Sequence, residues 1–278
     1  MARPLYEGKV VWITGASSGI GRSLVLAFHR SGAKLILSAR REDNLEDVGD
    51  MCGGDSIVHL LPLDLANLEG VAEKAQYALS LEGAIDYMVH NAGVALRDLA
   101  VETDMKVDRE IMATNYLGPV AITKTILPSM LHRGSGHFVV MSSLSGKYGS
   151  PRLSAYSASK HALHGFFESL RSEVHAQGIR ITIVVPGFIR TPITVNALQG
   201  NGQAYGKMLS VHEKGMDPDE CANRTIRAVA RQKEEVLIGG PEIYSVYLKR
   251  FFPSLWSSLM RKHPVKMLER LFPPTRQP

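Results

Sequence analysis

Short apolar runs alternate along this chain with longer segments in which apolar residues recur at helical spacing. Such alternation is typical of an α/β fold in which helices cover both faces of a parallel sheet. The candidate strands are residues 10–13, 35–37, 57–61, 87–90, 138–141, 181–185 and 236–238. The candidate helices are residues 18–30, 67–81, 107–132, 154–176 and 218–231. We therefore expect a doubly wound parallel sheet of about seven strands.

The composition is that of one large folded domain. Of 278 residues, 45% are hydrophobic and 21% charged, which excludes a disordered chain. Cys52 and Cys221 lie far apart without metal-ligand spacing, so neither a disulfide framework nor a metal site is indicated. A reducing compartment, the cytoplasm, is the expected location. The first apolar run leads directly into a glycine-rich turn, which leaves no room for a signal peptide, and no run of about 18 uncharged apolar residues follows.

The net charge of +5 is concentrated at one end of the chain. Residues 241–278 contain seven Lys and Arg side chains but only two acids, Glu242 and Glu269, so the rest of the chain is close to neutral. Charge therefore gives no reason to expect nucleic-acid binding. We expect residues 1–240 to form one domain and residues 241–278 to form a basic amphipathic C-terminal extension.

A glycine-rich turn follows the first candidate strand and opens the first candidate helix. It reads Thr14-Gly15-Ala16-Ser17-Ser18-Gly19-Ile20-Gly21. Backbone N–H groups and the helix dipole can hold a pyrophosphate in this context, as they do in Rossmann-type folds. Three glycines alone also fit a tight turn that needs glycine for backbone reasons only.

This octapeptide resembles the cofactor turn T-G-x-x-x-G-I-G of the short-chain dehydrogenase/reductase family. The resemblance covers about residues 8–240 and implies a single Rossmann-type domain that binds a nicotinamide cofactor. At the turn itself, the residues that it places beside the cofactor are Gly15, Ser17, Ser18, Gly19 and Ile20.

Three later strand ends carry further matches to the family. They are an acidic residue near the adenine, an N-A-G motif beside the adenosine ribose, and a segment at the nicotinamide amide with Thr191 as its expected contact. Each residue alone is more often a turn residue than a ligand, but together and in order they predict a cofactor site. The set is Asp64, Leu65, Asn91, Ala92, Gly93, Pro186, Gly187, Ile189 and Thr191.

Two arginines after the second candidate strand indicate which nicotinamide cofactor binds. A site for NAD usually places a carboxylate there for the ribose 2′-hydroxyl, whereas this chain has Arg40 and Arg41. A guanidinium suits a 2′-phosphate through paired, charge-assisted hydrogen bonds. We expect NADP(H), with Arg40 as the first contact and Arg41 as the second. The alternative is two solvated surface arginines.

Tyr156 and Lys160 lie four residues apart on a candidate helix, and Ser143 ends the fifth candidate strand. The family pattern has a serine at this offset before its Y-x-x-x-K motif. Reduction of a ketone needs a proton donor near neutral pH, but a free phenol has a pKa of about 10. Lys160 is expected to lower the pKa of Tyr156 and to bond the nicotinamide ribose. Ser143 would hydrogen-bond the substrate oxygen, although it could also be a simple strand-end cap.

Asn115 matches the fourth catalytic residue of the family. Asparagine is unfavourable within a helix, and in the family this residue bends the helix and holds a water that links the lysine to solvent. A tolerated polar residue is the alternative. Two histidines near the motif, His161 and His164, are predicted to be packing or surface residues.

The extension mixes large apolar residues with the basic cluster, which suits a membrane surface. It could instead cap the substrate or contact a partner subunit. With Lys147 and Tyr148, it resembles the branch of 11β-hydroxysteroid dehydrogenases and membrane-associated lipid-carbonyl reductases. Residues 188–216 have no clear period and are expected to form a loop or lid over the substrate.

The resemblance and the site residues together predict an NADPH-dependent carbonyl reductase, or an alcohol dehydrogenase in the reverse direction. The expected substrate is an apolar ketone or secondary alcohol of the steroid, retinoid or keto-lipid class. The alternative is a non-catalytic NADP(H)-binding regulatory protein that acts through its basic tail. An epimerase is disfavoured because only about 40 residues follow the last candidate strand. The family also implies a homodimer or homotetramer.

Overall fold

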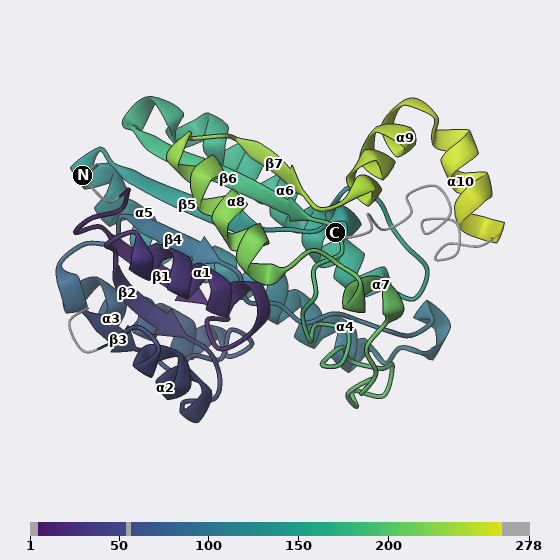
Figure 1. Cartoon of the computed structure of the whole chain (residues 1–278), viewed down its shortest axis with the longest axis horizontal. Coiled ribbons are helices and arrows are strands. Elements are labelled where there is room, and N and C mark those ends of the chain that lie inside the picture. The colour runs from purple at the N-terminus through teal and green to yellow at the C-terminus, as the bar shows by residue number, and fades with distance from the viewer. Residues whose placement is uncertain (1–4, 54–56, 263–278) are drawn as a thin grey trace.

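The computed structural model describes residues 5–53 and 57–262. Its seven strands form one parallel sheet in the order β3-β2-β1-β4-β5-β6-β7, as the sequence predicts (Figure 1). The chain leaves β1, builds outward to β3, and returns to β4 on the other side of β1, so a topological switch point lies between β1 and β4. The strands are β1 Val10–Thr14, β2 Lys34–Ser38, β3 Val58–Leu60, β4 Tyr87–His90, β5 Gly136–Met141, β6 Ile179–Pro186 and β7 Glu235–Ile238.

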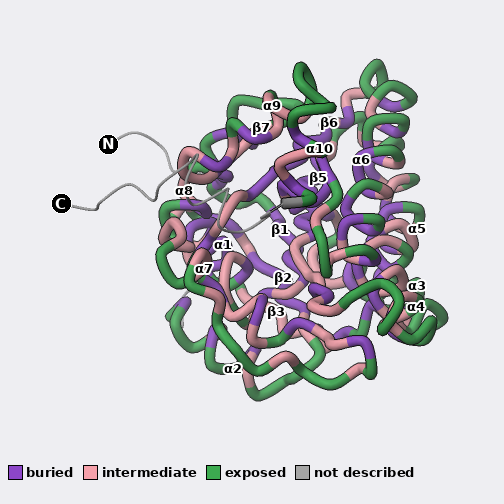
Figure 2. The backbone as a smooth tube through the Cα atoms, turned by 90° about the vertical axis from the view of Figure 1, so that its right-hand side faces the viewer, coloured by how far each residue is buried: buried purple, intermediate pink, exposed green. Residues whose placement is uncertain are grey.

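Helices cover both faces of the sheet because successive side chains of each strand point to opposite sides. Val10 and Trp12 of β1 belong to one core, and Val11 and Ile13 belong to the other. Figure 2 shows the sheet between the two helical layers. The first layer contains α3 Leu68–Glu82, α5 Gly118–Arg133 and α6 Ser154–Val174, and the second contains α1 Gly19–Arg30, α2 Asp43–Asp50 and α8 Pro218–Ala230.

The candidate helix at residues 107–132 is interrupted in the structure. It consists of α4 Met105–Met112, a π-helical turn at Ala113–Leu117, and α5. The wide turn contains Asn115, the residue that the family resemblance placed at a bend. A regular apolar period did not indicate this interruption, because both flanking helices keep buried residues on one side.

Helix α2 was not predicted, since only two of its eight residues, Leu45 and Val48, are buried and no period can be recognised. The start of α8 agrees with the sequence: Pro218 is its first residue, and Asp217 caps it by accepting a hydrogen bond from the backbone N–H of Asp219 at 2.9 Å.

The loop and the extension lie at the carboxyl ends of the strands. Residues 188–216 are mostly irregular, with one short helix, α7 Ser210–Glu213. The extension forms a 3₁₀ turn at Pro241–Tyr244, then α9 Ser245–Phe251 and α10 Pro253–Lys262 (Figure 1). Residues 263–278, with the basic side chains Lys266, Arg270 and Arg276, lie outside the described residues. Within residues 5–53 and 57–262, the apolar stretches of the helices are all too short for a membrane crossing.

Candidate active site

One large cavity, of about 820 Å³, lies at the carboxyl ends of the central strands. This is where open α/β sheets bind ligands, at the switch point of the strand order. Every residue that the sequence assigned to the cofactor lines this cavity. Of the four catalytic candidates, Ser143, Tyr156 and Lys160 also line it, whereas Asn115 is fully buried behind it.

The glycine turn is shaped by close backbone packing. Gly15 has a φ of +65°, and a Cβ at this position would lie 2.7 Å from the Cα of Ala92. A Cβ on Gly21 would overlap the carbonyl oxygen of Gly15. The side-chain amide of Asn91 donates to the carbonyl oxygens of Thr14 and Gly15, at 3.0 and 3.1 Å. The end of β4 therefore fixes the turn.

The turn is also suited to hold an anionic group. Ser18 precedes the first turn of α1 and makes no side-chain capping bond, so the N–H groups of that turn have no side-chain acceptor from their own N-cap. Ser18 and Gly19 line the cavity, and backbone N–H groups at a helix start favour phosphate. The residues present thus fit the pyrophosphate of a dinucleotide.

Arg40 and Arg41 follow β2 and are exposed at the cavity edge. Neither forms an ion pair with another residue of the described chain. Asp64 is also exposed there, and its Oδ1 accepts a hydrogen bond from the N–H of Ala66 at 3.0 Å. Two unpaired guanidinium groups beside the cavity fit a phosphate on the adenosine ribose.

Ser143 and Tyr156 both line the cavity and are hydrogen-bonded to each other. The Ser143 hydroxyl accepts a hydrogen bond from the N–H of Ser145 at 3.1 Å, so the capping role is real, but this hydroxyl can still donate its own proton. Burial raises the pKa of Tyr156, and a hydrogen bond with Ser143 lowers it only in part. This direction is opposite to the one expected from Lys160.

The position of Lys160 explains the difference. Its ammonium donates to the carbonyl oxygen of Met141 at 2.8 Å and lies 5.8 Å from the centre of the Tyr156 ring. Lys160 is only 4% exposed, and burial lowers its pKa to about 8. The lysine therefore titrates near neutral pH and is directed at β5 rather than at the phenol.

Asn115 joins three parts of the site. Its side-chain oxygen accepts from the N–H of Val94 at 2.8 Å, and its amide donates to the carbonyl of Val94 at 2.9 Å and to the hydroxyl of Ser159 at 3.0 Å. Both amide hydrogens are thus used by the protein. The π-helical turn places this side chain between the N-A-G segment and α6.

The sequence predicts that residues 188–216 form a lid and leaves open that the extension caps the substrate, but it does not identify the side chains that form the walls of the substrate end of the cavity. They come from the segment after β4, from the loop, and from the extension. These lining residues include Leu96, Arg97, Leu144, Tyr148, Phe188, His212 and Met260. Tyr148 could have been found from its place between Ser143 and Tyr156, but no pattern in the sequence indicates Met260, which is more than 100 residues away.

Tyr148 and the extension pack against each other. The Tyr148 ring lies 4.5 Å from the ring of Trp256, centre to centre, and its hydroxyl hydrogen-bonds Ser245 at 2.8 Å. Trp256 and Met260 are both buried, although the helix that carries them is near the end of the described chain. Helix α10 therefore closes one side of the cavity.

Glu242 is a second unpredicted anchor. It is 6% exposed, and its Oε1 accepts hydrogen bonds from the N–H groups of Phe188, at 2.9 Å, and Gly240, at 3.0 Å. Gly187 and Gly239 pack so closely on this carboxylate that a Cβ on either would clash with it. The extension is therefore tied to the segment at the end of β6.

The sheet has a switch point, and the glycine turn and a Ser-Tyr-Lys set line the same cavity. These features occur together in one enzyme class. The chain belongs to the short-chain dehydrogenase/reductase family of oxidoreductases, since the family model "short chain dehydrogenase" matches residues 9–202. Among curated proteins it is similar to a Drosophila melanogaster protein named dehydrogenase/reductase SDR family protein 7-like. The two are 42% identical over 266 residues, which cover 94% of this chain and 82% of the relative.

Solved structures of the family have the same fold. A short-chain dehydrogenase/reductase from Burkholderia phymatum, in complex with NAD, superposes with a TM-score of 0.80 at 22% identity, covering 95% of this chain and 98% of that one. A metagenomic short-chain oxidoreductase in complex with NADP gives a TM-score of 0.70 at 26% identity, covering 84% and 98%.

Proposed function

We propose that this protein is an NADPH-dependent carbonyl reductase that acts on an apolar ketone, or on the corresponding secondary alcohol in reverse. The observation that carries the proposal is the convergence of Ser143, Tyr156 and Lys160 at one cavity with the glycine turn. A non-catalytic NADP(H)-binding protein would not need these three side chains together.

The bound nicotinamide would supply or accept the hydride. Ser143 donates a hydrogen bond to the substrate carbonyl oxygen and orients it. Tyr156 gives its phenolic proton to that oxygen during reduction and takes it back during oxidation. Lys160, with a pKa near 8, supports this exchange and hydrogen-bonds the ribose. A water relay through Asn115 would use its main chain, since its side-chain amide hydrogens are engaged by Val94 and Ser159.

The preference for NADP(H) is argued from Arg40 and Arg41, because family members of similar fold are known with either cofactor. Substitution of Arg40 by Asp should remove the phosphate contact and repel the 2′-phosphate. We expect the ratio of kcat/KM with NADPH to that with NADH to fall by about tenfold to 100-fold. An unchanged ratio would refute the assignment of Arg40.

The extension is proposed to cap the substrate end of the domain formed by residues 1–240. Met260 lines the cavity, and Trp256 holds its helix against Tyr148. Outside the cavity, the extension exposes a group of large apolar side chains close to Lys249 and Arg250, which supports peripheral contact with a membrane as a second role. This group consists of Tyr244, Tyr247, Phe251, Phe252 and Leu255. A homodimer or homotetramer is proposed from the family alone.

The deciding experiment measures NADPH oxidation against a panel of apolar ketones, with NADH in parallel. Tyr156→Phe should lower kcat by at least about 100-fold, the typical contribution of a general acid, while the Kd for NADPH stays within about twofold. Tyr77→Phe is the matched control, because Tyr77 is 54% exposed and outside the cavity. Tight NADPH binding without turnover of any ketone or alcohol would favour the regulatory alternative.

A further inference from the structure

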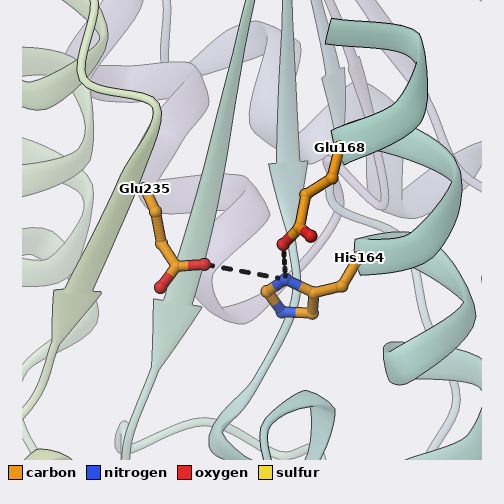
Figure 3. A group of neighbouring side chains, drawn as sticks. All are labelled: His164, Glu168 and Glu235. Carbon is orange, nitrogen blue, oxygen red and sulfur yellow. Dashed lines mark hydrogen bonds and ion pairs between the residues drawn. The ribbon is translucent and has the colours of Figure 1, made fainter. Parts of the chain in front are cut away.

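A group of titratable side chains lies next to the proposed catalytic serine. His164 of α6, Glu168 one turn later, and Glu235 of β7 place their ligand atoms within 4.8 Å of one another (Figure 3). His164 is 7% exposed. Its Nε2 lies 2.9 Å from the hydroxyl of Ser142, the residue next to Ser143. The group therefore contacts the end of β5 at the residue next to the proposed catalytic serine.

This group does not require a metal ion, because a cation of the protein already lies within it. The ammonium of Lys147 is 2.5 Å from Glu235 Oε2 and 3.3 Å from His164 Nδ1. Bound metal would have to displace this ammonium. Lys147 itself follows the short 3₁₀ turn Leu144–Gly146, so it links the segment after Ser143 to β7.

The surrounding charges determine which ring nitrogen of His164 carries the proton. An ammonium can only donate, so Nδ1 accepts from Lys147, and Nε2–H donates to Ser142. Glu168 lies equally near Nδ1, at 3.3 Å, but its side chain is 51% exposed and screened by water. Burial, followed by the charge of Lys147, lowers the pKa of His164, while Glu235 and Glu168 oppose this shift. The ring is therefore neutral at pH 7.

Three consecutive residues of β5 and its end are held by one face of α6. Lys160 donates to the carbonyl of Met141, His164 donates to the hydroxyl of Ser142, and Tyr156 pairs with Ser143. The three helical residues are spaced by four, which aligns them on one face. Gly146 packs against the contact between His164 and Ser142. A Cβ on this glycine would lie 3.1 Å from the His164 ring and overlap the Ser142 hydroxyl.

We infer that His164 is a positioning residue: through the hydroxyl of Ser142 it fixes the orientation in which Ser143 meets the substrate oxygen, and Lys147, itself paired with Glu235, holds the ring in the tautomer that does so. The inference rests on the proposed function of Ser143 and Tyr156. This positioning role differs from a packing role because it depends only on the Nε2–H group of the ring, and the side-chain amide of glutamine can replace that donor.

The test compares His164→Leu, which removes the N–H donor, with His164→Gln, whose amide lies near the position of Nε2. For a ketone that the wild type reduces, we expect His164→Leu to lower kcat by about tenfold, the effect of one hydrogen bond, with KM within about twofold. His164→Gln should recover most of the loss. The matched control is His161→Leu, since His161 is an exposed histidine on the same helix.

Two results would overturn the inference. One is an unchanged kcat in His164→Leu. The other is an equal loss of kcat in both variants together with an equal loss of Tm, which would indicate packing only.

A spectroscopic measurement is independent of turnover. In protein with ¹⁵N-labelled histidine, the His164 signal should be that of a neutral ring protonated at Nε2 at pH 7, and Lys147→Met should allow the other tautomer. A ring that is charged, or protonated only at Nδ1, contradicts the inference. If the wild type reduces no ketone, the proposed function has failed, whereas this measurement still decides the state of His164.

Discussion

The two ends of the cavity are built in different ways. On the proposed cofactor side, residues 10–93, the residues that line the cavity follow strand ends or lie in the turn that opens α1, and backbone packing shapes that turn. On the substrate side, residues 188–216 and 241–262, the walls are irregular or short helices held by a few side chains, chiefly Glu242 and Trp256. Regular secondary structure thus fixes the first side, and isolated tertiary anchors fix the second.

This difference predicts which measured properties a substitution on each side should change. A change on the cofactor side should alter dinucleotide binding and overall stability together, because both depend on the same backbone. A change to a substrate-side anchor should alter substrate KM more than cofactor Kd, unless the anchor also reaches the end of β6.

The largest effect on cofactor binding is expected from Gly21→Ala. The new methyl group would overlap the Gly15 carbonyl, so the turn must open. Overpacking of this kind costs about 1–3 kcal/mol, which corresponds to roughly a 10- to 100-fold higher Kd for NADPH, and Tm should fall as well. Cofactor fluorescence and thermal unfolding measure the two effects. Gly165→Ala on α6 is the control, since a Cβ there meets no atom within 4 Å.

Glu242→Ala tests the anchor that connects both sides. It leaves the partly buried N–H groups of Phe188 and Gly240 without their acceptor, at a cost of about 1 kcal/mol or more. We expect lower stability in urea unfolding and weaker binding of both cofactor and substrate. Equal stability of the variant would show that the loop is held by other contacts. Glu220→Ala, on the exposed face of α8, is the control.

Trp256→Ala should distinguish most clearly between effects on substrate binding and effects on cofactor binding. Truncation of a buried Trp costs about 3 kcal/mol or more, which here should undock α10 and raise substrate KM by roughly tenfold. The Kd for NADPH should stay the same, and amide exchange should increase only in α9 and α10. A parallel loss of cofactor binding would argue against two independently built sides. Leu255→Ala, 51% exposed, is the control.

The smallest effect at neutral pH is on the free energy of unfolding, and it comes from two buried histidines on the central strands β4 and β5. Burial lowers the pKa of His90 to about 3 and that of His137 to about 4, so both rings are neutral in the folded protein. Unfolded histidines take up protons near pH 6.5, and stability should therefore decline as pH falls from about 6.5 towards 4. His90→Leu should flatten this decline in urea unfolding, whereas exposed His132→Leu should not. An identical slope in wild type and His90→Leu would contradict the prediction.

What the sequence could predict follows the same division. The seven strands and the glycine turn have local signatures, because period and glycine placement are dictated within a few residues. Glu242 and Met260 have none: an isolated acid and an isolated methionine acquire their roles only when the extension returns to the end of β6. The pKa of Tyr156 was expected in the wrong direction for a related reason, since the spacing to Lys160 is local but burial and the Met141 carbonyl are not.

The π-helical turn at Ala113–Leu117 also limits how this chain can change in length. A turn of this kind adds one residue to a helix that would otherwise run on regularly, and each helical residue rotates the chain by about 100°. Deletion of one residue from this turn should therefore leave a regular helix in which Ile122, Ile126 and Met130 still face the sheet, while Asn115 loses the position from which it bonds Val94 and Ser159. A change of length within residues 113–117 should thus disturb the contacts of Asn115 more than the packing of α5.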